Sequence, residues 1–547
     1  MNILGISAGF SHDSSACILI DGKIEYAIEE ERIIRKKYAE HAKPIYAIKT
    51  CLDACNLTLN EIDYVAISWN PYMFDSNSLT PGDDMFYKAL FPVSIHGKYK
   101  KPIIHIVDHH IAHAAHVFWN SNFEKSCIIV MDGTGETHSG SIFIGDKING
   151  IRELYSYDVG ASLGYFYQAA SSYCGLGYLG TGKLMGLAAY GEKNDFIFEN
   201  IVVDNQYGYR VDNESITFED NMKYWYKKFA NFQYCPNFFS KKEVFCPEYI
   251  DFASKVQNTL NNVLINVTNT AIIRSGIYDV CFGGGVSMNA ASNLCIAEQT
   301  LANKVFTFAG GGDAGSCIGA AMQAYFEITG NPCYALSNAY LGSEISNNDV
   351  YLKLKEYNIN ATYLDDDRLY NHVANILAEG YSIGVVEGRE EFGARALGNR
   401  SILFDSKIEK GRDKLNFIKK REKWRPFAPV ILDKYFSKYL HLPYKSHYMT
   451  SNFRVTDEGK LNMREAIHID NTCRPQLAME NSFVEKILKQ YSDHTNCGAL
   501  INTSFNTKGN PIVHTPDDAL REFYTSGLDC LLLGNFLLEK PKSAELR

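Results

Sequence analysis

A repeated pattern of short apolar segments separated by polar turns most constrains the fold of this chain. Residues 3–7 and 16–20 have the composition of two strands joined by a polar turn, and a third such segment follows at 24–28. The order of strand, turn and strand returns at 127–131 and 141–144. We therefore expect an α/β fold whose N-terminal part contains a duplicated subdomain.

Two further turns are rich in glycine. One contains Gly284 and Gly285 and leads to Asn289, and the other, residues 310–312, precedes Asp313. Backbone N–H groups at the start of a helix suit polyphosphate, so the first turn is a candidate nucleotide site. Each turn by itself is equally typical of an ordinary strand end in an α/β protein.

A run of four histidines lies just before the second set of strands. If residues 109–116 form a helix, as their alanines indicate, His109 and His113 project from the same face. Two such imidazoles can share a metal ion, although buried histidines that are hydrogen-bonded locally show the same spacing. Spacing alone does not select the pair, because His116 lies on this face too and His110 is adjacent. The HExxH pattern of zinc proteases is absent.

Composition excludes several classes of protein. The chain has 547 residues, enough for two to four domains. A formal charge of -9 with scattered Lys and Arg argues against a nucleic-acid partner. The 14 cysteines contain no CxxC pair, which favours free thiols in a reducing compartment. Because no apolar run approaches the roughly 18 residues of a membrane span, we expect a cytoplasmic protein with no membrane partner.

Two segments differ in composition from their surroundings. Residues 328–350 are rich in Gly, Asn and Ser and predict a domain boundary, giving domains at 1–340 and 350–547. Residues 192–250 are rich in aromatics, including those at 237–239, and we expect an insertion whose aromatics form a small core of their own.

The second domain is expected to bind an anionic small molecule. A strand at 383–386 is followed by basic segments set among Gly, Pro and aromatic residues. A single surface Arg or Lys is usually a solvated charge, but several such segments in an acidic chain favour convergence on one anion. The candidate cations are Arg395, Lys419, Arg421, Arg425 and Arg474.

Seven ordered motifs occur along the chain. They are Ser11–Ala16, Glu29–Arg32, His109–Ala114, Gly182–Gly191, Phe392–Ser401, Arg425–Pro429 and Asn502–Asn506. Together they resemble the nodulation-type O-carbamoyltransferases, which include enzymes that carbamoylate antibiotics, and the resemblance extends to near residue 540. It implies an N-terminal actin- or sugar-kinase-like domain similar to the tRNA threonylcarbamoyl transferase, and a C-terminal YrdC-like α/β domain.

The resemblance also implies roles for residues of the N-terminal domain. Its metal ligands would be His109, His113, Asp132 and Asp313, a set that suits Fe²⁺, with Mn²⁺ or Zn²⁺ as alternatives. His12 would be a catalytic base beside the acceptor hydroxyl. The alternative for His12 is a turn histidine bonded to its neighbour Asp13.

In the C-terminal domain the resemblance implies that ATP and carbamoyl phosphate form carbamoyl adenylate, whose carbamoyl group the N-terminal domain transfers to a hydroxyl. ATP with Mg²⁺ would be held by the catalytic Lys419 together with Arg421, Ser504 and Asn506. Carbamoyl phosphate would be held by Arg395, Arg425 and Arg474. The sequence departs from the family pattern at residues 309–312 and at Cys473.

The expected partners are ATP, carbamoyl phosphate and a hydroxylated small molecule, and the sequence is compatible with a homo-oligomer. Two alternatives remain, one from the metal-binding domain and one from the N-terminal turns. A tRNA-modifying threonylcarbamoyl transferase shares the metal-binding domain, but the arginine-rich C-terminal domain and the lack of a basic stripe oppose it. A sugar-kinase-like ATPase would release ADP, whereas an adenylating enzyme releases AMP.

Overall fold

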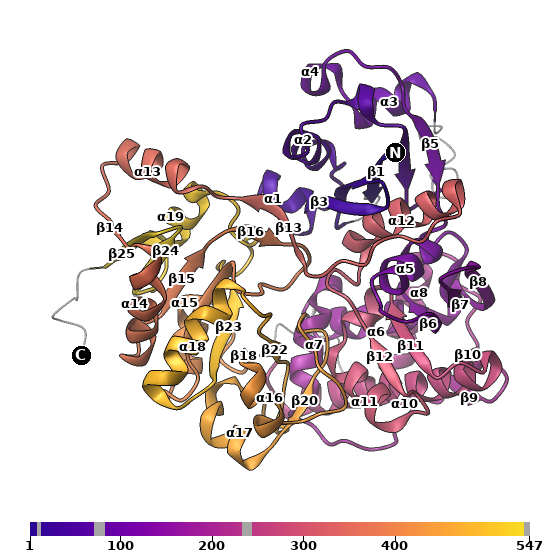
Figure 1. Ribbon diagram of the computed structural model, residues 1–547. Coiled ribbons are helices and arrows are strands. Elements are labelled where there is room, and N and C mark those ends of the chain that lie inside the picture. Colours follow the sequence, from indigo (N-terminus) through magenta and orange to yellow (C-terminus); the bar gives the residue numbers. More distant parts are fainter. Residues whose placement is uncertain (8–11, 71–81, 232–242, 541–547) are drawn as a thin grey trace. The chain divides into compact units, whose positions relative to one another are not determined.

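The computed structural model describes residues 1–7, 12–70, 82–231 and 243–540 (Figure 1). The chain divides into two compact units, Met1–Ile34 with Tyr38–Asn338, and Arg35–Lys37 with Ala339–Arg547. The main division, after Asn338, falls inside the Gly-, Asn- and Ser-rich segment 328–350. Ser11, Phe238 and Phe239 lie outside the described residues.

The first unit opens with a five-stranded sheet of order β3-β2-β1-β4-β5. In it, β1 pairs antiparallel with β2 and parallel with β4. Both faces are buried along β1, which explains why its sequence is almost continuously apolar. The strands are β1 (Asn2–Ser7), β2 (Ser15–Ile20), β3 (Lys23–Glu29), β4 (Tyr64–Ile67) and β5 (Ile103–Ile106).

A second five-stranded sheet repeats this topology, with the order β12-β11-β6-β7-β8. Here β6 pairs antiparallel with β7 and parallel with β11, as β1 does with β2 and β4. The duplicated subdomain predicted from the sequence is therefore confirmed, and so is the α/β class. The strands are β6 (Lys125–Met131), β7 (His138–Asp146), β8 (Gly150–Asp158), β11 (Asp279–Gly283) and β12 (Lys304–Phe306).

Two helices of the first unit, α5 (His109–Trp119) and α12 (Ser316–Thr329), cross very closely. A Cβ atom on Gly319 would lie 1.8 Å from the carbonyl oxygen of Ala112, so only glycine permits this approach. Asp108 caps α5 by accepting a bond from the Ile111 N–H at 3.0 Å. The helix predicted over the histidine run is thus present. The other helices before α6 are α1 (Glu30–Ile34), α2 (Ile45–Ala54), α3 (Asp84–Leu90) and α4 (Val93–His96).

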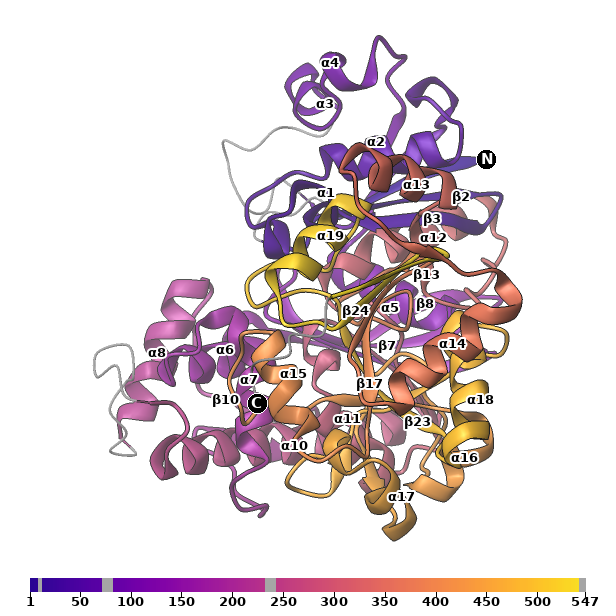
Figure 2. The same cartoon turned by 90° about the vertical axis from the view of Figure 1, so that its left-hand side faces the viewer.

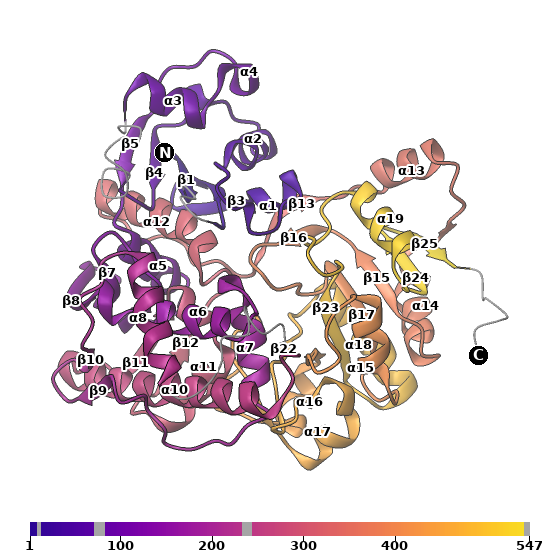
Figure 3. The ribbon, with the colours of Figure 1, turned by 180° about the vertical axis from the view of Figure 1, so that it is seen from behind.

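The aromatic insertion contains β9 (Ile201–Asp204), β10 (Gly208–Val211) and α8 (Phe218–Ala230), and α8 lies beside α6 (Leu163–Tyr173) (Figure 3). Trp225 packs on Phe166 of α6, with ring centroids 4.8 Å apart. Phe229 packs on Phe252 of α10 at 5.0 Å. Aromatics of the insertion also contact one another, as Trp225 does Phe229 with ring centroids 5.9 Å apart. The expected small core is therefore present, but it is shared with α6 and α10 and is not separate from them. The remaining helices are α7 (Thr181–Ala188), α10 (Pro247–Ser275) and α11 (Ala290–Gln299).

The second unit is built on an eight-stranded mixed sheet of order β14-β25-β24-β15-β17-β23-β18-β22. Its strands are β14 (Thr362–Tyr363), β15 (Ile383–Val386), β17 (Arg400–Asp405), β18 (Ala428–Ile431), β22 (Gln476–Leu477), β23 (Ala499–Ser504), β24 (Cys530–Leu533) and β25 (Phe536–Glu539). A two-stranded sheet pairs β13 (Tyr340–Glu344) with β16 (Arg389–Glu391), and a three-stranded sheet contains β19 (Leu440–His441), β20 (Phe453–Val455) and β21 (Thr472–Cys473).

Helices α14 (Asp366–Ala378) and α18 (Phe483–Thr495) pack side by side in this second unit (Figure 2). The other helices of the unit are α13 (Asn347–Glu356), α15 (Gly411–Ile418), α16 (Asp433–Tyr439), α17 (Asp457–Asn462) and α19 (Pro516–Thr525). Among the described residues of both units, no helix combines the length and apolar character required to cross a bilayer. The 13 cysteines within these residues are free thiols, ten of them buried.

Candidate metal centre

Four side chains of the first unit meet in one buried cluster, which we call the His–Asp cluster: His109, His113, Asp132 and Asp313. One ligand atom from each lies within 4.8 Å of all the others. The Nε2 atoms of the two histidines are 3.0 Å apart, and Asp132 Oδ2 lies 3.0 Å from His113 Nε2. Asp313 Oδ1 lies 3.7 Å from both Nε2 atoms. Two imidazoles and two carboxylates are a donor set that binds a divalent transition metal.

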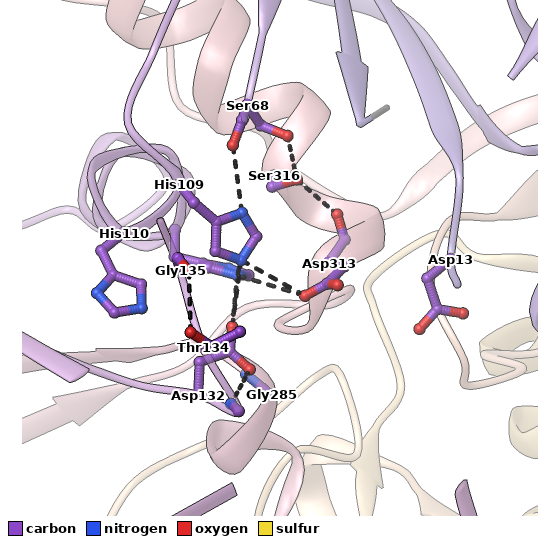
Figure 4. Close-up of polar contacts among 12 residues, drawn as sticks. Asp13, Ser68, His109, His110, Asp132, Thr134, Gly135, Gly285, Asp313 and Ser316 are labelled. Carbon is purple, nitrogen blue, oxygen red and sulfur yellow. Dashed lines mark hydrogen bonds and ion pairs between the residues drawn. The ribbon is translucent and has the colours of Figure 1, made fainter. Parts of the chain in front are cut away.

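Neighbouring backbone groups orient these side chains (Figure 4). The Nδ1 of His109 faces the Ser68 carbonyl oxygen at 3.2 Å, so an Nδ1–H tautomer leaves the Nε2 lone pair inside the cluster. The Oδ1 of Asp132 accepts bonds from the Gly133 N–H at 2.7 Å and the Gly285 N–H at 3.2 Å. Its Oδ2 is thereby left for the histidines. The donor atoms of these four residues are therefore suited to hold a metal ion.

The electrostatics of the cluster reflect mutual attraction between imidazoles and carboxylates. Burial opposes the charged form of His113, but Asp132 and Asp313 outweigh it and raise the pKa of His113 to about 9. Burial likewise opposes ionisation of Asp132, yet hydrogen bonds from His109 and His113 hold the pKa of that carboxyl well below its usual range. A bound cation would take over the role that the protons play here.

His12 borders this cluster. Its Nδ1 lies 3.0 Å from Asp13 Oδ2 and 4.0 Å from Asp313 Oδ2. Burial disfavours its charged form, but the bond to Asp13 and the charge of Asp313 raise the pKa of His12 to about 9. The bond of a turn histidine to Asp13 is thus present, and so is the proximity to a candidate ligand. Its assignment as the catalytic base stays a prediction.

The two other histidines of α5 point elsewhere. His110 Nδ1 lies 3.0 Å from the Ser141 hydroxyl, and burial lowers the pKa of His110 to about 3. His116 packs edge-on against Phe308 with ring centroids 5.5 Å apart. Although α-helical spacing places His116 near the same face, it lies about 4.5 Å further along the helix axis than His113. Its ring packs against Phe308 and is not part of the cluster.

The glycine-rich turn proposed for nucleotide binding has partners inside the first unit. The Gly285 N–H bonds Asp132, and a Cβ atom on Gly284 would lie 2.3 Å from the Met131 carbonyl oxygen. Asn289 caps α11 through the Ser292 N–H and exchanges bonds with Gln257. These contacts give all three residues a structural role, and their binding of nucleotide stays a prediction.

In the second unit, Lys419 is buried beside the two residues predicted to share its site. Its Nζ donates to the Ser504 carbonyl oxygen and hydroxyl, the latter at 3.3 Å. It also donates to the carbonyl oxygen of Asn506 at 3.0 Å and to Asn506 Oδ1 at 3.1 Å. All of these acceptors are uncharged. Burial, reinforced by nearby cations, holds the pKa of Lys419 well below its usual range.

The predicted arginines form a linked set, in which Arg421 and Arg425 lie near Lys419 and also near Arg474. Arg421 donates to Asn416 Oδ1 at 2.5 Å and to the Pro426 carbonyl oxygen at 2.9 Å, and its guanidinium lies 4.0 Å from the centre of the Phe427 ring. Burial lowers the pKa of Arg474, and the charges of Arg395, Arg421 and Arg425 lower it further. The structure thus brings together the five predicted cations, which we call the cation cluster: Arg395, Lys419, Arg421, Arg425 and Arg474.

Several supporting residues were missed from the sequence. The Ser68 carbonyl that orients His109 carries no local signal, since any residue supplies a carbonyl. Asn416, which holds Arg421, sits in an ordinary amphipathic helix. Glu136 follows the turn after Asp132, and its carboxylate accepts the His109 backbone N–H at 3.1 Å. Such contacts are set by packing and cannot be read from spacing.

Comparison with known proteins gives consistent matches along the chain. A family model described as Carbamoyltransferase N-terminus matches residues 2–81 and 79–322, and one described as Carbamoyltransferase C-terminus matches residues 374–540. An uncharacterised protein of Synechocystis sp. is 32% identical over 604 residues, covering 98% of this chain and 97% of the relative. The nodulation protein NolNO of Sinorhizobium fredii is 29% identical over 568 residues, covering 98% and 80%.

A shorter match joins the chain to an enzyme of named activity. The 3'-hydroxymethylcephem-O-carbamoyltransferase of Streptomyces clavuligerus is 30% identical over 246 residues, covering 44% of each chain. Among solved structures, full-length HypF in its phosphate- and nucleotide-bound form aligns with a TM-score of 0.38 and 14% identity, covering 61% of this chain and 47% of HypF. Since models of one family match both parts of the chain, the protein belongs to the carbamoyltransferases and is a transferase enzyme.

Proposed function

We propose that the protein is an ATP-dependent O-carbamoyltransferase that forms carbamoyl adenylate and transfers its carbamoyl group to a hydroxyl of a small-molecule natural product or sugar. One observation carries this proposal: the chain contains two separate buried polar sites, the His–Asp cluster in the first unit and the cation cluster in the second. A reaction in two steps needs two sites of such different charge.

The cation cluster is assigned the first step. Carbamoyl phosphate, ATP and water would become carbamoyl adenylate, phosphate and pyrophosphate. Lys419 and Arg421, with Ser504 and Asn506, would hold ATP with Mg²⁺, and Arg395, Arg425 and Arg474 would hold carbamoyl phosphate. Guanidinium groups suit phosphate because they donate two parallel hydrogen bonds. We also assign this unit the YrdC-like fold that the motifs imply.

The His–Asp cluster is assigned the second step. Fe²⁺, or Mn²⁺ or Zn²⁺, held by its four residues would act as a Lewis acid toward the activated carbamoyl group. His12, which lies 4.0 Å from Asp313, would take the proton from the attacking hydroxyl. The new carbamate ester forms as the bond to AMP breaks, and AMP leaves with the carbonyl-bound phosphate oxygen.

Labelled carbamoyl phosphate and ATP test the first step directly. We expect the purified protein to release pyrophosphate and to form carbamoyl adenylate, and to release AMP once an acceptor is present. Release of ADP would indicate a kinase instead. If no pyrophosphate is formed by protein with Lys419 intact, the proposal is wrong. A screen of hydroxylated sugars and polyketides for a mass gain of one carbamoyl group then identifies the acceptor.

A further inference from the structure

We propose that Glu522 is a positioning residue for the nucleotide site around Lys419, an inference that rests on the proposed function. Glu522 lies in α19, and its side chain is only 4% exposed. A buried carboxylate is costly unless hydrogen bonds compensate the lost hydration. The hydrogen-bond partners of this carboxylate therefore indicate its role.

Both oxygens of Glu522 hold the turn that follows β23. Oε2 accepts the Thr507 backbone N–H at 3.0 Å. Oε1 accepts the Asn510 side-chain amide at 2.5 Å and the Thr507 hydroxyl at 3.4 Å. The Asn510 backbone N–H also bonds the Thr507 carbonyl oxygen at 3.1 Å. The carboxylate thus ties the two ends of the turn 507–510 to one point on α19.

This turn sets the orientation of the Asn506 side chain. Its Nδ2 donates to the Asn510 carbonyl oxygen at 2.6 Å, which leaves Oδ1 facing the other way. There Oδ1 accepts the Lys419 Nζ at 3.1 Å and the Ser504 hydroxyl at 2.7 Å. Without the Asn510 carbonyl in place, the amide could turn its NH₂ group toward the ammonium. Glu522 therefore determines which end of Asn506 meets Lys419.

Glu522 also supplies charge to the same site. Burial disfavours the ammonium of Lys419, and the charges of Arg421, Arg425 and Lys37 disfavour it further. Glu522 acts against them and favours the charged form. The groups that accept hydrogen bonds from Nζ, on Ser504 and Asn506, are uncharged. Glu522 thus has two separable effects, one on the shape of the site and one on the charge of Lys419.

The test measures pyrophosphate release from ATP and carbamoyl phosphate, a reaction that requires no acceptor. In Glu522→Gln the new NH₂ group faces a donor of the turn, so one bond is lost together with the charge. We expect the KM for ATP to rise about tenfold or more, in line with the loss of a charged hydrogen bond. The alkaline limb of the kcat/KM profile should move to lower pH, because Lys419 loses its proton more readily.

A second variant separates the two effects. Asn510→Ala removes the amide that bonds Glu522 but keeps the carboxylate, so the KM for ATP should rise while the alkaline limb stays in place. In Glu522→Asp the charge is retained, and the limb should return toward its wild-type position. Glu485→Gln is the matched control, since this buried carboxylate of α18 pairs with Lys489 at 2.6 Å and does not contact the turn.

Thermal melts and calorimetric titration with a non-hydrolysable ATP analogue accompany each assay, so that loss of folded protein is counted separately. The inference is overturned if Glu522→Gln binds the analogue and turns over like Glu485→Gln, or if its alkaline limb coincides with that of wild type. If wild-type protein releases no pyrophosphate, the proposed function itself fails and the inference falls with it. Wild-type activity with an unaffected Glu522→Gln overturns the inference alone.

Discussion

The two buried polar clusters of this protein are opposites in charge and in construction. In the His–Asp cluster, imidazoles and carboxylates contact one another directly, with His113 Nε2 3.0 Å from Asp132 Oδ2. In the cation cluster, like charges lie near one another. Uncharged oxygens hold Lys419, and Glu422 lies 3.7 Å from Arg425 at its edge. The first combines opposite charges, whereas the second brings together like charges whose repulsion a bound anion would relieve.

The difference shows how each site is kept ready for its ligand. Backbone groups, the Ser68 carbonyl and the Gly285 N–H, use the outer atoms of His109 and Asp132 and leave the inner atoms for a cation. Carbonyl and amide oxygens hold Lys419 and Arg421 without neutralising them, so their charge remains for an anion. Neutral partners thus position both clusters while preserving the charge that each offers.

The largest effect is expected from removing a member of the His–Asp cluster. In His109→Ala or Asp313→Ala we expect carbamoyl transfer to fall by about a thousandfold or more, the loss of several kcal/mol of Lewis-acid stabilisation. Pyrophosphate release should remain measurable. Metal content, read by elemental analysis, should fall in both variants but not in His110→Asn, whose ring faces Ser141. Equal loss of both half-reactions would remove the distinction between the two clusters.

The converse experiment changes the cation cluster. In Lys419→Met we expect pyrophosphate release to fall by about a hundredfold, as for the loss of a charged hydrogen-bonding group in a dry site. The metal content and the transfer from separately prepared carbamoyl adenylate should stay close to those of wild type. A variant that loses its metal as well would show that the two clusters are not independent.

Removing one charge from each cluster should have a smaller effect, and the resulting change in protein stability should differ between the two clusters. Arg474 is buried among other cations, and its Nε has no hydrogen-bond partner. Arg474→Gln should raise the KM for carbamoyl phosphate about tenfold. At the same time it should leave the melting temperature of the ligand-free protein unchanged or higher, because repulsion is relieved. Asp132→Asn in the His–Asp cluster should lower that temperature. A large drop for Arg474→Gln would contradict the view that its cluster is repulsive.

The final expected effect is on stability and concerns a carboxyl outside both clusters. Burial raises the pKa of Glu30 to about 7, although the backbone N–H groups of Ala47 and Tyr46 oppose the shift. Between pH 4.5 and about 7 the folded chain keeps a proton that the unfolded chain has lost, so stability falls as pH rises. Above pH 7 the free energy of unfolding is lower by about 3 kcal/mol than it is below pH 4.5. Denaturant titrations should show this fall in wild type and not in Glu30→Gln, with exposed Glu124→Gln behaving like wild type.

The fold could be predicted in part because its signals are local. The apolar runs of β1, β2 and β6 and the helical spacing of His109 and His113 depend on neighbours within a few residues. The aromatic core expected within the insertion is shared with α6, which could not be predicted because a sequence pattern does not state against which helix Trp225 packs. The roles of Gly284, Gly285 and Asn289 were ambiguous for the same reason.

By itself, the sequence determined the α/β class, the duplicated strand pattern, the presence of histidines at helical spacing and the accumulation of basic segments after residue 390. Resemblance to a family was needed to choose His109 and His113 and to add Asp132 and Asp313. Only the tertiary structure decided that His116 turns toward Phe308, that Gly285 bonds Asp132, and that Glu522 orients Asn506 beside Lys419. Secondary structure follows from backbone geometry over a few residues, whereas these contacts join segments that meet only when sheets and helices pack.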